Sequence, residues 1–261
     1  MKRVLTVIIL SGLILSLSAL SLAGCRGLVK GSGELETREY ELNNFTNIEI
    51  SHAFNFEISQ SNFYGVTVTA DDNLFKYVEA VKTGERLEIG LKPNYGYITT
   101  HLKVVITMPE LRSLDISGAS TGFIKGFSSS EVLIAGVSGA SSLDLVDIIT
   151  GDIDFKISGA SGVTGSLVAH DVRFELSAAS KIQLTGSAVD MTVDASGASR
   201  VELGSFSVIN VDIVLSGASW GTVNLSGTLD ADISGASHLS YIGDPVLGNI
   251  NTSGASSITR K

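Results

Sequence analysis

The sequence predicts an all-β fold: a right-handed, single-stranded parallel β-helix (β-solenoid) with an irregular, β-rich N-terminal cap. Three observations predict it. A tetrapeptide recurs eight times at intervals of 18 to 21 residues, apolar and polar residues alternate on both sides of each copy, and no segment from Leu114 onward carries a helical apolar face. A repeat this short cannot hold two helices, and one such unit cannot bury its own apolar face, so successive coils must stack.

The chain begins with the pattern of an export signal. Lys2 and Arg3 precede an uncharged apolar run over residues 4–20, and small residues lead to Cys25, the single cysteine of the 261-residue chain. A positive start, an apolar middle and a small-residue end are typical of a secretory signal peptide, which we expect over residues 1–24. The four residues ending at Cys25 resemble the lipobox of bacterial lipoproteins, in which the cysteine carries the lipid. The alternative is an ordinary signal peptide followed by a chance cysteine.

Lipidation at Cys25 predicts a membrane as a partner, because acyl chains anchor a protein at ~0.8 kcal/mol for each buried methylene. Residues 25–33 are expected to hold the lipidated cysteine and a short tether. No second run of about 18 apolar residues follows, so no other membrane-spanning segment is expected. The chain contains 18 lysines and arginines and 27 acidic residues, which gives a net charge of −9. An electrostatic footprint for nucleic acid is therefore missing, and nucleic acid is not expected as a partner.

Residues 34–112 are rich in strand patterns but lack the tetrapeptide. We expect them to form the irregular first coils and the cap of the solenoid, since terminal repeats are usually atypical; a separate sandwich is the alternative. Strands are predicted at Glu39–Leu42, Asn47–Ser51, Phe54–Ser59, Gly65–Ala70, Tyr77–Lys82, Arg86–Leu91 and Leu102–Met108.

Residues 113–261 carry the eight repeats. The residues one and three places before each copy are mostly apolar, and the residue between them is mostly polar, which predicts strands with one buried face. Three short strands and their corners would account for a coil of this length. Ser-Gly-Ala-Ser begins at Ser117, Ser138, Ser158, Ser196, Ser216, Ser234 and Ser253, and a Ser-Ala-Ala-Ser variant begins at Ser177.

Each residue of the tetrapeptide has an expected role at a corner of the coil. Glycine allows a positive φ, alanine is expected to fill a narrow inward space, and the serines can hydrogen-bond the turning backbone or the same serine one coil away. Ala178 replaces the glycine in one copy. Either a positive φ is not demanded there, or a modest strain is tolerated.

The serines do not form a recognisable nucleophilic site. His52, His101, His170 and His238 follow no regular offset from them, so no histidine is placed to act as their general base. The repeats also differ from the Gly-Gly-x-Gly-x-Asp pattern of calcium-binding β-rolls. We therefore expect no catalytic residue, no metal site and no cofactor.

The residue that follows each tetrapeptide should lie on the outer surface, in one column across the coils. In four consecutive copies this residue is Lys181, Arg200, Trp220 and His238, and Trp220 is the single tryptophan. An exposed aromatic ring flanked by cations could stack on a sugar ring while Arg200 and Lys181 bind carboxylate or hydroxyl groups. The alternative is a set of ordinary solvated residues, with Trp220 lying over its neighbours' stems or over the cap.

A second outward column is acidic and invites an enzyme interpretation. Glu175 and Asp194 should be neighbours in it, as carboxylates are in β-helical polysaccharide lyases and hydrolases. This column is interrupted by Gly136, Lys156 and Val214, and we expect Lys181 and Arg200 to lie near enough to neutralise it. The regular spacing of the repeats also leaves no room for a cleft-forming insertion. A smooth rod is therefore expected. Three further carboxylates close to this column are Asp212, Asp230 and Asp232.

The lipobox, the opening segment Phe45–Ile50, the segment Leu87–Lys92 and the repeated Ser-Gly-Ala-Ser together resemble the bacterial putative autotransporter adhesin, head GIN domain family. The resemblance covers residues 37–261. It implies a β-helical fold, an exported location and an adhesive role, and it brings no catalytic residues.

These observations predict a lipid-anchored, extracytoplasmic β-solenoid of the cell envelope or cell surface. We expect it to act as a non-enzymatic adhesion or interaction module, with a glycan or a surface protein as its partner. The alternatives are a carbohydrate-active β-helix enzyme of the lyase or hydrolase type, and a purely structural envelope spacer without a ligand.

Overall fold

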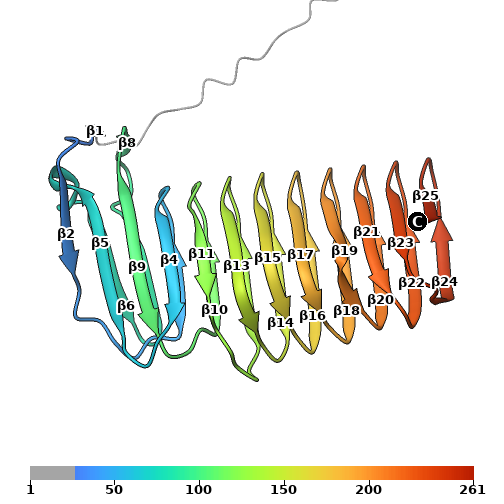
Figure 1. Ribbon diagram of the computed structural model, residues 1–261. Coiled ribbons are helices and arrows are strands. Elements are labelled where there is room, and N and C mark those ends of the chain that lie inside the picture. Colours follow the sequence, from blue (N-terminus) through green and yellow to red (C-terminus); the bar gives the residue numbers. More distant parts are fainter. Residues whose placement is uncertain (1–26) are drawn as a thin grey trace, which may run out of the picture.

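The computed structural model describes residues 27–261, and they form the predicted all-β solenoid of stacked parallel coils (Figure 1). From β10 onward, each coil adds one strand to an 11-stranded sheet and one to a 12-stranded sheet. The first sheet receives β10 (Ser113–Ile116), β12 (Leu133–Val137), β14 (Ile153–Ile157), β16 (Asp171–Leu176), β18 (Asp190–Ala195), β20 (Asn210–Leu215), β22 (Thr228–Ile233) and β24 (Val246–Thr252). The second receives β11 (Thr121–Lys125), β13 (Ser142–Ile149), β15 (Gly162–Val168), β17 (Lys181–Ser187), β19 (Arg200–Val208), β21 (Trp220–Leu225), β23 (His238–Ile242) and β25 (Ser257–Arg260).

A coil therefore contains two strands, and the expectation of three short strands is wrong. The strands are longer than that expectation assumed: β19 has 9 residues and β13 has 8. At about 3.3 Å per residue, two such strands and two tight corners use up a repeat of this length.

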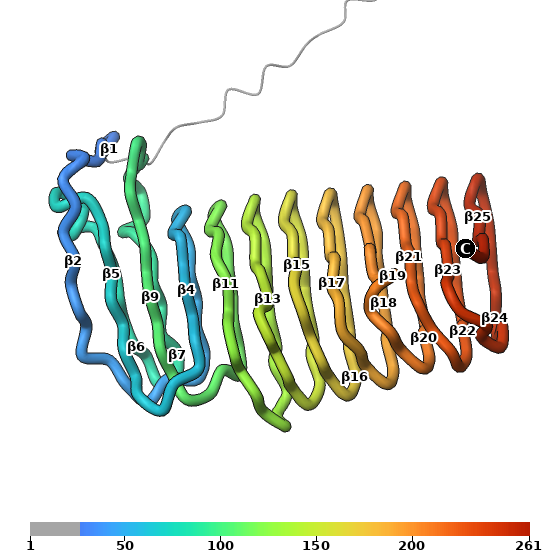
Figure 2. Tube along the Cα trace, viewed as in Figure 1, coloured from blue at the N-terminus to red at the C-terminus, as the bar shows by residue number. Residues whose placement is uncertain are grey.

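The N-terminal segment continues both sheets. Its elements are β1 (Leu28–Lys30), β2 (Leu35–Glu39), β3 (Asn47–Ile50), β4 (Asn55–Gln60), β5 (Gly65–Asp71), the 3-10 helix η1 (Asp72–Leu74), β6 (Val78–Thr83), β7 (Arg86–Leu91), β8 (Gly96–Ile98) and β9 (Leu102–Met108). Strands β3 and β4 pair in parallel with β10 and β11, while β6, β2 and β5 close the two sheets with antiparallel pairs. In Figure 2 the chain doubles back here, so that β9 lies between β5 and β4.

Part of the segment expected to be a tether belongs to the fold. Leu28–Lys30 form β1, which pairs in parallel with β8, and the backbone N–H of Gly33 donates to the buried carboxylate of Asp71 at 2.7 Å. The predicted signal peptide, Cys25 and Arg26 lie outside the described residues.

The core lies between the two sheets and is built from the two predicted inward columns. In the first sheet, Phe155 and Ile157 of one coil lie in register with Phe174 and Leu176 of the next, and all four are buried. The two phenylalanine rings lie 6.1 Å apart between centroids. Stacking of identical positions gives each inward side chain an apolar neighbour above and below, which is how a thin rod excludes water.

The tetrapeptide turns the chain at the corner between the two sheets. Its second residue has a φ between 62° and 78° in all eight copies, including 62° at Ala178, so the strain of a left-handed alanine is tolerated there. The alanine in the third place is exposed in every copy, and the expectation that it fills an inward space is wrong. The fourth residue, a serine, points inward instead: the hydroxyl of Ser219 is buried and donates to the carbonyl of Ser216 at 2.8 Å.

Candidate functional site

The predicted outward column exists as a continuous row on the 12-stranded sheet. Lys181, Arg200, Trp220 and His238 are partners in register on β17, β19, β21 and β23. The side chain of Trp220 is 54% exposed, so the cap does not cover it. Its ring stacks on the imidazole of His238, with centroids 4.9 Å apart and planes inclined by 36°. The tryptophan is thereby held with its rings accessible to solvent.

The cations of this row are paired with Glu202, which lies two residues beyond Arg200 on the same face of β19. Lys181 Nζ lies 2.8 Å from Glu202 Oε2, and Arg200 Nη1 lies 3.6 Å from Glu202 Oε1. The hydrogen bond from Lys181 holds the pKa of Glu202 below its usual range, against partial burial, and Arg200 acts in the same direction. Lys181 is therefore engaged, whereas Arg200 makes a longer contact and remains the more available cation.

Trp220 and Arg200 border a hollow of about 540 Å³ on the outer face of the sheet. Polar side chains from four coils also line it: Gln183, Thr185, Glu202, Ser205, Thr222 and Ser240, with Lys261 at one side. Small-molecule sites in proteins commonly measure about 300–1,000 Å³ and combine an apolar surface with a few polar groups. The hollow has the size and the composition of such a site.

A bulge in β19 produces the hollow. Leu203 pairs with Val223 and Ser207 pairs with the next residue, Asn224, so three residues of β19 have no partners on β21. Of these three, Phe206 is fully buried and anchors the bulge in the core. The expected smooth rod is thus interrupted here, and β13 has a further irregularity between Leu145 and Ile148. The sequence itself indicates the bulge in β19: the inward apolar residues are Val201, Leu203, Phe206 and Val208, so the alternation shifts by one position after Leu203.

The acidic column lies on the other sheet. Glu175 and Asp194 are neighbours in register, as predicted. Their neutralising partners are not Lys181 and Arg200, which the coil corner separates from them. Instead, Arg173 Nη2 lies 2.7 Å from Glu175 and Lys156 Nζ lies 3.5 Å from it. The hydrogen bond from Arg173, helped by Lys156, holds the pKa of Glu175 below its usual range. A general acid requires the opposite shift.

The remaining predicted carboxylates are spread along the same sheet. Asp212 of β20 pairs in register with Asp230 of β22, and Asp232 lies two residues further along β22. Two serine–histidine contacts escaped the sequence analysis: Ser257 Oγ lies 2.9 Å from Nε2 of His238, and Ser51 Oγ lies 2.7 Å from Nδ1 of His52. The first extends the candidate row by one coil. Within residues 27–261, no helix is long and apolar enough to cross a membrane.

The fold and the hollow define a class: a two-sheet parallel β-solenoid with a hollow on one outer face that polar side chains and Trp220 line. A family model described as putative auto-transporter adhesin, head GIN domain, matches residues 44–245. The chain belongs to this family.

Solved structures share the fold at low sequence identity. A putative adhesin from Parabacteroides merdae superposes with a TM-score of 0.81 at 18% identity, covering 90% of this chain and 99% of that one. A protein from Parabacteroides distasonis titled putative lipid binding protein gives 0.80 at 20% identity, covering 90% and 99%. A putative adhesin from the same organism gives 0.81 at 19% identity, covering 90% and 100%. No curated protein matches this chain in sequence.

Proposed function

We propose that this protein is a lipid-anchored, extracytoplasmic adhesion module that binds a glycan without transforming it. The observation that carries the proposal is the hollow in which the exposed ring of Trp220 and the guanidinium of Arg200 face the same space. The family description and the adhesin titles of two structural neighbours support an adhesive role.

The hollow offers what a sugar ring needs. One face of a pyranose ring presents C–H groups that pack against an aromatic ring, and its edges carry hydroxyl groups. Hydroxyl and amide side chains of Thr222, Ser205 and Gln183 line the same space and can both donate and accept hydrogen bonds. Arg200 adds a planar charged donor suited to a carboxylate. An acidic sugar unit of a longer chain fits this combination.

The charge of the hollow also suits binding of a glycan more than cleavage of its glycosidic bonds. Hydrolysis of a glycosidic bond commonly uses a carboxyl group with a raised pKa beside the bond as the general acid. The carboxylate nearest to Trp220 in the hollow is Glu202, and Lys181 holds its pKa below the usual range. Glu202 is therefore suited to accept hydrogen bonds from hydroxyl groups as a permanent anion.

The test is a glycan and matrix-protein array probed with the full chain in detergent, combined with a reducing-sugar release assay on each hit. We expect retention on acidic glycans without product release, and loss of retention in Trp220→Ala. The matched control is Phe63→Ala, which removes an exposed aromatic side chain far from the hollow, 79% accessible, and should leave binding unchanged. Unchanged retention in Trp220→Ala would refute the site. Product release would favour the polysaccharide-active enzyme. If the chain binds nothing on the array, the structural spacer would be favoured.

Lipid anchoring through Cys25 is the second part of the proposal, and it rests on the lipobox-like sequence before that residue. Cells fed a radiolabelled fatty acid should label the wild-type chain, and Cys25→Ser should abolish the label and shift the protein from the membrane fraction to the soluble fraction. A label that survives in Cys25→Ser would contradict anchoring at this residue.

A further inference from the structure

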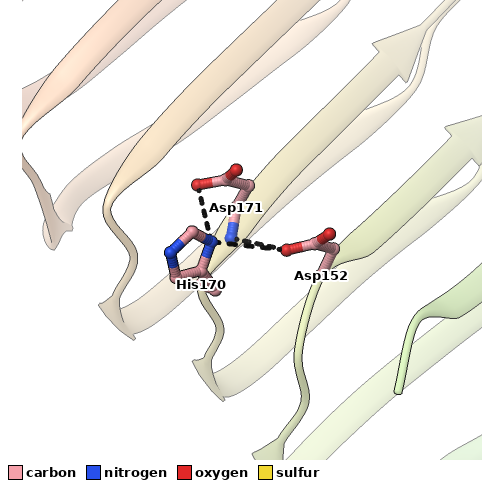
Figure 3. Close-up of side chains that lie close together, drawn as sticks. All are labelled: Asp152, His170 and Asp171. Atoms are coloured by element: carbon pink, nitrogen blue, oxygen red, sulfur yellow. Dashed lines mark hydrogen bonds and ion pairs between the residues drawn. The ribbon is translucent and has the colours of Figure 1, made fainter. Parts of the chain in front are cut away.

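A small cluster of side chains occupies the corner opposite the tetrapeptide, where each coil enters the 11-stranded sheet. Asp152 directly precedes β14; one coil further on, His170 directly precedes β16 and Asp171 is the first residue of that strand (Figure 3). All three side chains are open to solvent, with side-chain exposures of 50%, 67% and 46%. The cluster belongs neither to the hollow nor to the acidic column described above.

The spacing of the three side chains suits a metal ion. His170 Nδ1 lies 3.2 Å from Asp171 Oδ1 and 3.6 Å from Asp152 Oδ1, and one donor atom from each residue lies within 4.8 Å of the other two. Two ligands placed about 2.1 Å from a tetrahedral zinc ion are about 3.4 Å apart. Small rotations of exposed side chains would bring all three donors to that distance without moving the backbone.

The backbone already orients both carboxylates. The N–H of Asp171 donates to Asp152 Oδ1 at 3.2 Å, and the N–H of Asp190, one coil further, donates to Asp171 Oδ1 at 3.3 Å. A carboxylate oxygen that accepts one N–H keeps a second lone pair, and the other oxygen remains free. Hydrogen bonds of this kind hold metal-ligating carboxylates in position and raise affinity.

The charge of this corner also points to a cation. Asp152, Asp171 and Asp190 follow one another on consecutive coils, which places like charges about 4.8 Å apart. Within residues 27–261, no lysine or arginine forms an ion pair with any of the three. In contrast to these three aspartates, Glu175 on one outer face and Glu202 on the other each have two cationic partners. A bound dication would relieve the repulsion at this corner.

We propose that Asp152, His170 and Asp171 form a binding site for a divalent transition-metal ion of the zinc type. An imidazole nitrogen with two carboxylates is a donor set for zinc, whereas calcium requires six to eight oxygen ligands and magnesium retains an octahedral shell of oxygens. Three protein ligands on an exposed corner leave the fourth coordination position open to water or to a donor group of another molecule.

The test is a titration of the chelator-treated full chain with Zn²⁺ by isothermal calorimetry, repeated with Co²⁺ to observe its visible absorption in a nitrogen-containing site. We expect one site per chain, and a loss of affinity of about tenfold or more in His170→Ala and in Asp152→Asn. The matched control is His101→Ala, because His101 is an exposed histidine beside the single carboxylate of Asp71, at 3.5 Å, and should bind no ion.

Circular dichroism of the metal-free variants shows whether each is folded, and Asp152→Asn preserves the shape of the side chain and an oxygen acceptor. Absence of zinc binding to the wild-type chain would overturn the proposal. Binding that His170→Ala and Asp152→Asn leave unchanged, or that His101→Ala weakens equally, would overturn it as well.

Discussion

The stacked corners predict that Gly197→Ala destabilises the protein more than an ordinary glycine substitution. Gly197 has a φ of 76° and lies directly on the corner of the preceding coil. A Cβ atom added to it would lie 2.6 Å from the carbonyl oxygen of Ala178 and 2.9 Å from its nitrogen. Both are backbone atoms, so no side chain can rotate away, and the two coils must separate locally.

The magnitude has two parts. An L-residue in the left-handed region costs about 1–2 kcal/mol, and the lower entropy of the unfolded alanine chain offsets about 0.4–1 kcal/mol of this, which leaves about 1 kcal/mol. Overpacking against rigid neighbours adds about 1–3 kcal/mol. We expect a total of about 3 kcal/mol. Gly84→Ala separates the two parts, because Gly84 has a φ of 61° and nothing lies within 4 Å of its added Cβ; it should lose only about 1 kcal/mol.

Urea unfolding followed by circular dichroism measures both variants against the wild-type chain. The reverse substitution, Ala178→Gly, should stabilise the protein by up to about 1 kcal/mol because it removes the left-handed strain. If Gly197→Ala proves no worse than Gly84→Ala, the coils do not restrict this position. If Ala178→Gly destabilises the protein, the strain at the corner has been misjudged.

Three further substitutions probe the cap, the bulge and the serine ladder. Asp71→Asn should lose about 1–3 kcal/mol because the buried carboxylate accepts N–H groups from Gly33 and His101, each at 2.7 Å. Burial alone raises the pKa of Asp71, but these hydrogen bonds bring it below the ordinary 3.8. The carboxylate therefore stabilises the fold fully above pH 3.8, and this stabilisation is lost as the pH falls through the lowered pKa of the folded state. Unfolding curves at neutral and acid pH should show this loss for the wild-type chain and not for Asp71→Asn. Phe206→Ala should lower the free energy of unfolding by about 3–5 kcal/mol in a urea titration and weaken glycan retention. Phe206→Leu should keep most of the stability and most of the retention. Equal stability of Phe206→Ala and the wild-type chain would show that Phe206 does not anchor the bulge. Ser219→Ala should lose about 1 kcal/mol by the same measurement, since the carbonyl of Ser216 loses a buried donor; Ser226→Ala, at an exposed turn, is the control and should lose nothing measurable.

The candidate row could be predicted from the sequence because the coils stack in register. Once a repeat is aligned on its tetrapeptide, residues at equal offsets become neighbours about 4.8 Å apart. Lys181, Arg200, Trp220 and His238 are therefore adjacent in the structure as they are in the alignment. Glu175 lies beside Asp194, as predicted, for the same reason.

Interactions between different offsets were not predictable in this way. Lys181 and Arg200 bind Glu202, which stands two places along the strand from Arg200, and not the acidic column beyond the corner. Which residues share a face across a corner depends on where the corner bends, and the expectation of three strands per coil left that open. The burial of the fourth residue of the tetrapeptide in place of the third has the same origin.

The sequence by itself determined the solenoid, its register and the composition of each column, because a 19-residue period with alternating apolarity has few other ways to bury its apolar side chains. Only the tertiary structure decided where the outer face of the sheet is hollowed. The hollow beside Trp220 depends on three unpaired residues of one strand, whereas Asp152 and Asp171 occupy the same position of consecutive repeats and the bend of the corner places His170 beside both. The hollow arises where the repeat departs from its own regularity, and the spacing of the tetrapeptides does not record such a local departure.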